Sequence, residues 1–186
     1  MTAIGELPEY RVHVRVLPQA GFAASIDATE DELAVLAAYC GIPKVERLHA
    51  DLVLRKWRSD GVSVNGRLHA AVEQQCVVSL EPVAQEIDVA IDRTFLPPGS
   101  RLAKPDAGGE LVLDPLGDDA PDLFEGSEID LWPVVAETLL LSLDPFPRAP
   151  GASLNPAYAP PGEAGEPGEA QTASPFAVLA EKKPEG

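Results

Sequence analysis

A long alternation of apolar and polar residues between Arg67 and Val78 constrains the fold more than any other feature of the chain. Leu68, Val72 and Cys76 share one set of alternate positions, and polar or small side chains fill the other. Successive side chains of a β-strand point to opposite faces, so this period of two predicts a strand with one buried face. Because such a face must be covered, the chain needs a sheet and a second layer packed on it.

Shorter alternations predict further strands on both sides of this segment. These strands are expected at residues 10–17, 45–57 and 87–95. Residues 18–24 are predicted to be a connector. The sequence Ser-Asp-Gly at 59–61 predicts a hairpin turn, since Asp and Gly favour tight turns. Asn65 and Gly66 predict another turn or a bulge.

Two helices are predicted from their caps. Thr29 and Glu32 can form a capping box, in which each side chain accepts a hydrogen bond from the other residue's backbone amide. Gly41 ends this helix, because glycine readily adopts a left-handed conformation. Asp130 is the predicted N-cap of a second, apolar helix that ends at about Leu143. The sequence therefore predicts an α+β fold, with a mainly antiparallel sheet or a small partly open β-barrel of about five to six strands and two covering helices.

The distribution of proline, glycine and acidic residues predicts the domain organisation. Residues 1–7 are expected to be a flexible N-terminus, and residues 8–147 a single domain. A long acidic loop is expected at about 99–128, with one short strand at 111–113. Residues 148–186 are rich in Pro, Gly, Ala and Glu, a composition that predicts a disordered tail.

The formal net charge of the chain is −16. This charge disfavours unaided binding to phosphate backbones, because affinity for them comes mainly from Lys and Arg. It favours solubility and encounter with basic partners. No apolar run approaches the ~20 residues that a membrane span needs, and the first residues lack the pattern of a signal peptide. A cytoplasmic protein that does not enter membranes is expected.

The sequence offers no assembled catalytic or metal-binding centre. Cys40 and Cys76 are the cysteines; two buried thiols are expected, and a single disulfide is the alternative. His69 lies on the same predicted strand as Cys76 but on the opposite face. The acidic residues between 114 and 125 lack the spacing of a calcium loop. We therefore expect no catalytic, cofactor-binding or metal-binding residues, no cofactor, and no enzymatic activity.

A basic segment with a tryptophan is the local exception to the acidic composition. Its candidate contact residues for RNA or a protein partner are Arg55, Lys56, Trp57, Arg58 and Arg67. An indole among cations can stack on an unpaired base while the cations meet phosphates. Two alternatives are a solvated outer face with the tryptophan packed on the sheet, and contact with the chain's own acidic tail.

Several short motifs follow the hairpin in order. They are Val64-x-Gly66-x-Leu68, Cys76-Val77-Val78-Ser79-Leu80-Glu81-Pro82-Val83, and Ile129-Asp130-Leu131 with Glu137 and several leucines behind it. In these motifs and their order, the chain resembles the YceD family of large ribosomal RNA subunit accumulation proteins over about residues 45–147. The positions that match the family pattern are Gly66, Cys76, Leu80, Pro82, Asp130, Leu131 and Glu137.

The resemblance implies a bacterial, cytosolic and non-catalytic ribosome-biogenesis factor that supports accumulation or processing of 23S ribosomal RNA. Its implied partner is a ribosome-assembly or RNA-processing protein, and its contact with ribosomal RNA is direct or indirect. An RNA-modifying or hydrolytic enzyme is the alternative. Many family members have a second cysteine where this chain has Ser79, so the resemblance does not support a metal site here.

Overall fold

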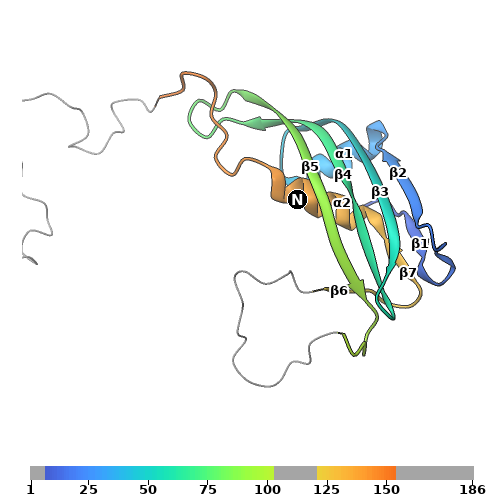
Figure 1. Ribbon diagram of the computed structural model, residues 1–186. Coiled ribbons are helices and arrows are strands. Elements are labelled where there is room, and N and C mark those ends of the chain that lie inside the picture. The colour runs from blue at the N-terminus through green and yellow to red at the C-terminus, as the bar shows by residue number, and fades with distance from the viewer. Residues whose placement is uncertain (1–6, 103–120, 154–186) are drawn as a thin grey trace, which may run out of the picture. The chain divides into compact units, whose positions relative to one another are not determined.

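A five-stranded sheet forms the main layer of the computed structural model, which describes residues 7–102 and 121–153 (Figure 1). Its strands, in spatial order, are β2 (Phe22–Asp27), β3 (Lys44–Trp57), β4 (Gly61–Gln75), β5 (Pro82–Leu96) and β6 (Asp122–Leu123). Neighbours from β2 to β5 are antiparallel, and β6 pairs in parallel with the end of β5. The sheet is open, so the predicted α+β fold is confirmed in its sheet form rather than its barrel form.

The N-terminal strand is shorter than predicted. β1 (Arg11–His13) pairs with β7 (Glu128–Asp130) in a separate two-stranded sheet. A 3₁₀ turn, η1 (Val14–Val16), follows at once, and the side chain of Val16 is 76% exposed. The expected strand at residues 10–17 was wrong beyond His13, because β7 offers only three residues to pair with.

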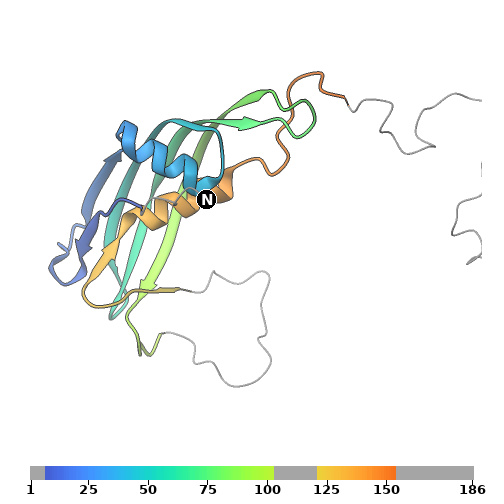
Figure 2. The same ribbon diagram turned by 180° about the vertical axis from the view of Figure 1, so that it is seen from behind.

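Both helices cover one face of the main sheet (Figures 1 and 2). α1 (Glu30–Cys40) begins at the predicted capping box, where the Thr29 amide donates to Glu32 Oε2 over 2.8 Å. α2 (Leu131–Ser142) begins at the predicted cap, where Asp130 Oδ1 accepts from the Trp132 amide over 3.1 Å. Both predicted helices are confirmed.

The core lies between the helices and the inner face of the sheet. Inward-facing residues of β3 and β4 alternate with exposed ones, as the period of two predicts. Fully buried aliphatic side chains dominate this layer, among them Leu36, Leu52, Leu54, Val64, Leu68, Leu131 and Leu139. The outer face of the sheet carries the polar side chains, so the interactions on that face are open to solvent.

Gly66 does not form the predicted turn or bulge. It lies inside β4, where it pairs regularly with Leu52 on one side and Ile91 on the other. A Cβ atom at this position would lie 2.0 Å from the backbone oxygen of Asp51. The glycine is therefore required because β3 approaches closely, a cause that the local sequence does not reveal.

The region predicted as a loop at 99–128 ends in ordered structure. β6 lies within it, and the Phe124 amide donates to the Leu96 oxygen over 3.0 Å. The predicted strand at 111–113, residues 1–6 of the N-terminus and most of the tail lie outside the described residues. The described elements belong to a first unit, Met1–Gly151, and a second unit begins at Ala152. β2 begins inside the segment predicted to be a connector.

Candidate nucleic-acid interface

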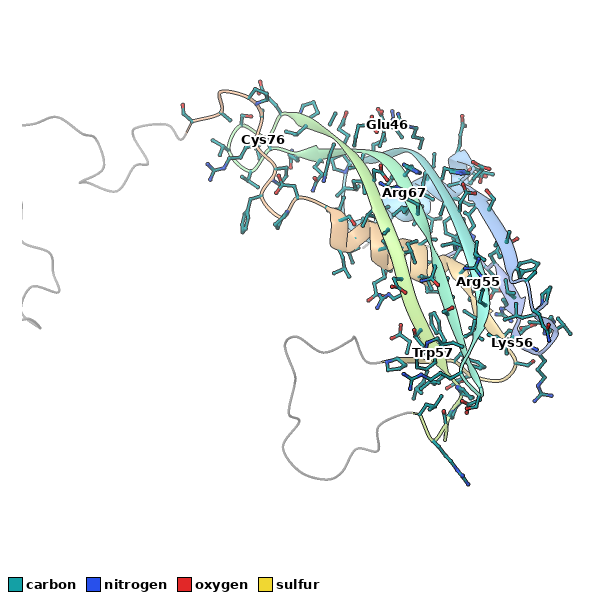
Figure 3. The ribbon with its side chains drawn as sticks, viewed as in Figure 1. Glu46, Arg55, Lys56, Trp57, Arg67 and Cys76 are labelled. Carbon is teal, nitrogen blue, oxygen red and sulfur yellow. The ribbon has the colours of Figure 1, made fainter. Side chains whose placement is uncertain are left out.

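The turn between β3 and β4 brings cations and an indole to one end of the sheet (Figure 3). The strands pair as far as Trp57 and Gly61, which confirms the predicted hairpin. The guanidinium carbon of Arg58 lies 4.3 Å from the centre of the Trp57 ring, which is a cation–π contact. Gly61 makes room for the indole, because a Cβ there would lie 2.8 Å from Trp57 Cε3.

Three cations of this turn are not neutralised by carboxylates. Arg55, Lys56 and Arg58 are exposed, and none of them forms an ion pair within residues 7–102 and 121–153. Several other cations of the domain are paired over 2.5–3.4 Å: Arg11 with Glu9, Lys44 with Glu46, Arg47 with Glu86, Arg67 with Asp88, and Arg93 with Glu137. The turn therefore presents positive charge that an external anion can neutralise.

Arg67 lies apart from the other candidate residues. It is part of the outer face of β4, opposite Asp51 of β3, and is labelled well away from Trp57 (Figure 3). Its guanidinium bonds to both carboxylate oxygens of Asp88, and this hydrogen bonding lowers the pKa of the Asp88 carboxyl. The structure thus brings together Arg55, Lys56, Trp57 and Arg58, which are named the hairpin cluster here, and leaves Arg67 outside.

The structure places another segment beside the hairpin cluster that the sequence did not single out. Phe22 of β2 pairs with Leu54, next to Arg55. Gly21 packs so closely that a Cβ on it would lie 3.0 Å from Arg55 Cγ. Phe22 also lines a hollow of about 390 Å³ with Val16 and Tyr10. Only the pairing of β2 with β3 brings these residues together, so no local signal could have found them.

Cys76 lies at the opposite end of the sheet (Figure 3). Its side chain is fully buried, and its Sγ atom accepts from the backbone amides of Ala149 and Ser79 at 3.3 Å and of Val78 at 3.4 Å. These donors, Ala149 first, favour the thiolate and lower the pKa of Cys76 to about 6 against the opposing effect of desolvation. Within the described residues both cysteines are free thiols, and burial raises the pKa of Cys40 to about 11.

Leu80 and Pro82 complete the turn that follows Cys76. The Leu80 amide donates to the Cys76 oxygen over 3.0 Å, and the Cys76 amide to the Glu81 oxygen over 2.8 Å. Leu80 has a φ of 62° although it carries a side chain, and that side chain is 66% exposed. Pro82 then begins β5. Because proline has no backbone N–H, this first position of the strand has no donor that needs a partner.

The remaining family-pattern residues lie at the start and along the exposed side of α2. Besides capping α2, Asp130 Oδ1 accepts from the Tyr10 amide over 2.9 Å and so fixes the N-terminal segment. Leu131 is fully buried. Glu137 pairs with Arg93 of β5 over 2.5 Å. The family-pattern residues thus make structural contacts at separate places in the fold and do not converge on one pocket.

Side chains that could bind a metal ion are scattered over the described part of the chain. No group of three or more His, Cys, Asp or Glu residues there is arranged to hold a metal ion. The acidic residues between 103 and 120 lie outside it. No helix in the described ranges has the length and apolar character needed to span a membrane.

Comparison with known families assigns the chain by its C-terminal two thirds. Residues 64–181 match the family described as "Large ribosomal RNA subunit accumulation protein YceD". The chain belongs to the YceD family. This confirms the resemblance found in the sequence and links the chain to accumulation of large-subunit ribosomal RNA. No curated protein and no solved structure matched the chain.

The YceD match does not include the hairpin cluster. It begins later than the resemblance drawn from the motifs and continues past Pro147 to residue 181. All seven family-pattern positions lie inside it, whereas the hairpin cluster at residues 55–58 lies just before it. The family match therefore says nothing about the hairpin cluster, and any role of the cluster rests on the residues of this chain alone.

Proposed function

We propose that this chain is a non-catalytic ribosome-biogenesis factor that supports accumulation or processing of 23S ribosomal RNA and contacts RNA through the hairpin cluster. The observation that carries the proposal is the set of three exposed cations without carboxylate partners in the described structure, beside an indole. Family membership supplies the link to ribosomal RNA. A cytoplasmic location in a bacterium is part of this proposal.

The hairpin cluster suits RNA that is locally single-stranded. A cation that neutralises a phosphate releases a counterion, whereas an arginine already bound to a carboxylate must first lose that partner. Trp57 is half-buried and carries the Arg58 guanidinium over its ring, so a base can stack on the indole when the Arg58 side chain turns to a phosphate. Three cations supply a modest affinity that falls with salt, and this fits a factor that must leave the RNA again.

A basic protein is the second candidate partner, and the net charge of −16 favours it. A ribosomal protein or an RNA-processing enzyme has the required positive charge. Such a partner would meet the acidic surface of the chain rather than the hairpin cluster. RNA would thus contact the positive charges of the hairpin cluster, whereas a basic protein would contact the negative charges of the rest of the surface. Variants that remove one kind of charge can therefore distinguish the two partners.

We also propose that the chain performs no catalysis. The pKa of Cys40 is raised by burial, which keeps this thiol protonated and unreactive. Cys76 has a lowered pKa, but its sulfur is fully buried and its hydrogen-bond partners are backbone amides rather than a base. His69 lies on the outer face of the sheet, beside Asp88.

The proposal is tested by capture from a lysate of the source organism. The tagged full chain is compared with the variant Arg55→Gln, Lys56→Gln, Arg58→Gln and with a control that loses the same charge, Arg11→Gln, Arg47→Gln, Arg67→Gln. The wild type and the control should enrich precursor or mature 23S RNA, and the hairpin variant should not. Nuclease treatment before capture separates partners held through RNA from partners held directly. Equal enrichment of 23S RNA by all three proteins would contradict the proposal.

A further inference from the structure

An open groove lies at the end of the sheet opposite the hairpin cluster, where both helices end. It has a volume of about 690 Å³. Residues after α1, residues of β4 and the last turn of α2 with the segment that follows it form its walls. A volume of this size is in the range that accommodates several side chains of a ligand.

Large apolar side chains around this groove are exposed to water. Among the residues that line it, Leu141 is 73% exposed, Val77 49% and Leu140 39%. Large apolar side chains exposed around one groove are characteristic of a binding surface. The backbone under it is held in place: the Val77 amide donates to the Pro147 oxygen over 2.9 Å. The apolar surface is therefore ordered before a partner arrives, which lowers the entropic cost of binding.

The polar groups of the groove are acceptors. Gln74 is 6% exposed, its Nε2 donates to the Asp144 oxygen over 2.9 Å, and its Oε1 has no donor among the described residues. Asp144 is the one ionised side chain among the residues that line the groove. A buried acceptor without a donor is unfavourable, so an occupant that supplies an N–H group gains this hydrogen bond if the enclosed Oε1 atom turns toward the groove.

The ends of the two helices make the groove still more negative. The C-terminal residues of α1 and α2, including Cys40 and Leu140, line it, and a helix C-terminus carries partial negative charge. Neither helix, both of which lie wholly in the described part, has a basic residue in its last turn to offset this charge. Lys44 pairs with Glu46, and Arg148 does not line the groove.

We propose that this groove binds a polypeptide segment of a partner protein in which Arg or Lys alternates with large apolar side chains. The apolar side chains would pack on Leu141 and Val77, and the cation would lie near Asp144 and the helix ends. A second copy of the chain is a poor occupant, because a net charge of −16 makes copies repel one another. RNA is a poor occupant because Asp144 and the negative helix ends at the groove repel phosphates. The proposal does not depend on the hairpin cluster.

The test uses the full chain and a fluorescent synthetic peptide in which leucines and arginines alternate. A peptide with glutamates in place of the arginines is the matched probe. Fluorescence anisotropy should show binding of the Leu/Arg peptide and none of the Leu/Glu peptide. Leu141→Ser with Val77→Ser should weaken binding about tenfold, because anchor side chains dominate such interfaces.

Matched variants make the result specific to the groove. Val16→Ser with Leu123→Ser removes two similarly exposed apolar side chains elsewhere and should leave binding unchanged. Asp144→Asn should weaken binding about threefold, the size of effect typical of a partly exposed ion pair. Glu125→Gln, an equal charge change elsewhere, should not. Neutralising Arg55, Lys56 and Arg58 should also leave peptide binding unchanged. Failure of the RNA proposal can therefore be distinguished from failure of the groove proposal.

Four outcomes would overturn the proposal. The first is the absence of binding to the Leu/Arg peptide, and the second is an equal loss in the groove and control variants. The third is a concentration-dependent dimer in sedimentation that Leu141→Ser with Val77→Ser abolishes, which would make a second copy the occupant. The fourth is peptide binding that appears only after substitution of Phe176, an apolar residue of the C-terminal tail, by Ser. That result would mean that the chain's own C-terminal residues fill the groove.

Discussion

The Sγ atom of Cys76 accepts a hydrogen bond from the backbone amide of Ala149 over 3.3 Å, although the two residues lie 73 positions apart. Together with the amides of Val78 and Ser79, this bond fastens the turn after β4 to the segment that leaves α2. Both parts contribute residues to the groove where the two helices end. A buried thiol thus has a structural role here that needs neither catalysis nor a metal.

Cys76→Ala should lower the free energy of unfolding by about 2 kcal/mol, because it leaves a small cavity and several backbone amides without their acceptor. Urea denaturation measures this loss. Cys40→Ala is the control, since Cys40 is only half-buried and its truncation should cost less. A Cys76→Ala protein that is as stable as the Cys40→Ala protein would show that the sulfur contacts contribute little.

The lowered pKa of Cys76 predicts a specific pH dependence of stability. The thiol titrates at about 6 in the folded chain and at about 8.5 when unfolded. The unfolded state therefore binds more protons between these values, so the contribution of Cys76 to stability rises with pH across this window and is lost as pH falls through 6. Thiolate absorbance in the ultraviolet should titrate near the lower value and vanish in Cys76→Ala. A midpoint near the unfolded value would contradict the hydrogen-bond account.

Gly66→Ala should destabilise the fold by about 3 kcal/mol or more, because the new Cβ would meet the backbone of β3 and cannot relax by a side-chain rotation. Gly99→Ala is the matched control. Gly99 has a φ of 78° but open space around it, so the cost there should be about 1 kcal/mol. Thermal or urea unfolding of the two variants ranks them. If Gly99→Ala lowered the free energy of unfolding as much as Gly66→Ala or more, the close approach of β3 to Gly66 would be ruled out as the cause.

His49 should carry a positive charge to a higher pH than an ordinary histidine. Its Nδ1 lies 2.6 Å from Asp27 and its Nε2 3.1 Å from Asp51, and these hydrogen bonds, that with Asp27 first, raise its pKa. The stabilisation is complete below about 6.5 and is lost as pH rises through the raised folded-state value. An NMR titration of the His49 ring should give a midpoint above 6.5, and Asp27→Asn should lower it. A midpoint that does not respond to Asp27→Asn would exclude this pairing.

The elements with local signals were predictable from the sequence. The capping box at Thr29 and the cap at Asp130 each lie within a few residues of the helix that they start, so their positions follow from side-chain chemistry alone. The long alternation after Arg67 predicted β4 because period-two patterns need no tertiary information. β2 was missed in part, since its small residues give a weak alternation and its pairing with β3 is not local.

The surroundings of Gly66 and Arg67 were not predictable from the sequence for a related reason. Gly66 gave a turn signal, but its role is set by Asp51 on the neighbouring strand. Arg67 was grouped with the hairpin by its sequence position, yet β4 carries it along the sheet to Asp88, 21 residues away in the chain. The composition of the hairpin cluster was readable from sequence. The sequence could not show that the cations of this cluster lack carboxylate partners among the described residues, because ion pairs form between strands.

The most direct test of the central claim is equilibrium binding of a single-stranded 23S RNA fragment to the purified full chain at several salt concentrations. The wild type should bind with an affinity that falls as salt rises. Replacing Arg55, Lys56 and Arg58 by Gln should reduce the slope of log affinity against log salt by about 2, since each phosphate contact on single strands contributes about 0.7. The charge-matched variant Arg11→Gln, Arg47→Gln, Arg67→Gln should keep the wild-type slope. Equal slopes for the wild type and the hairpin variant would contradict the account.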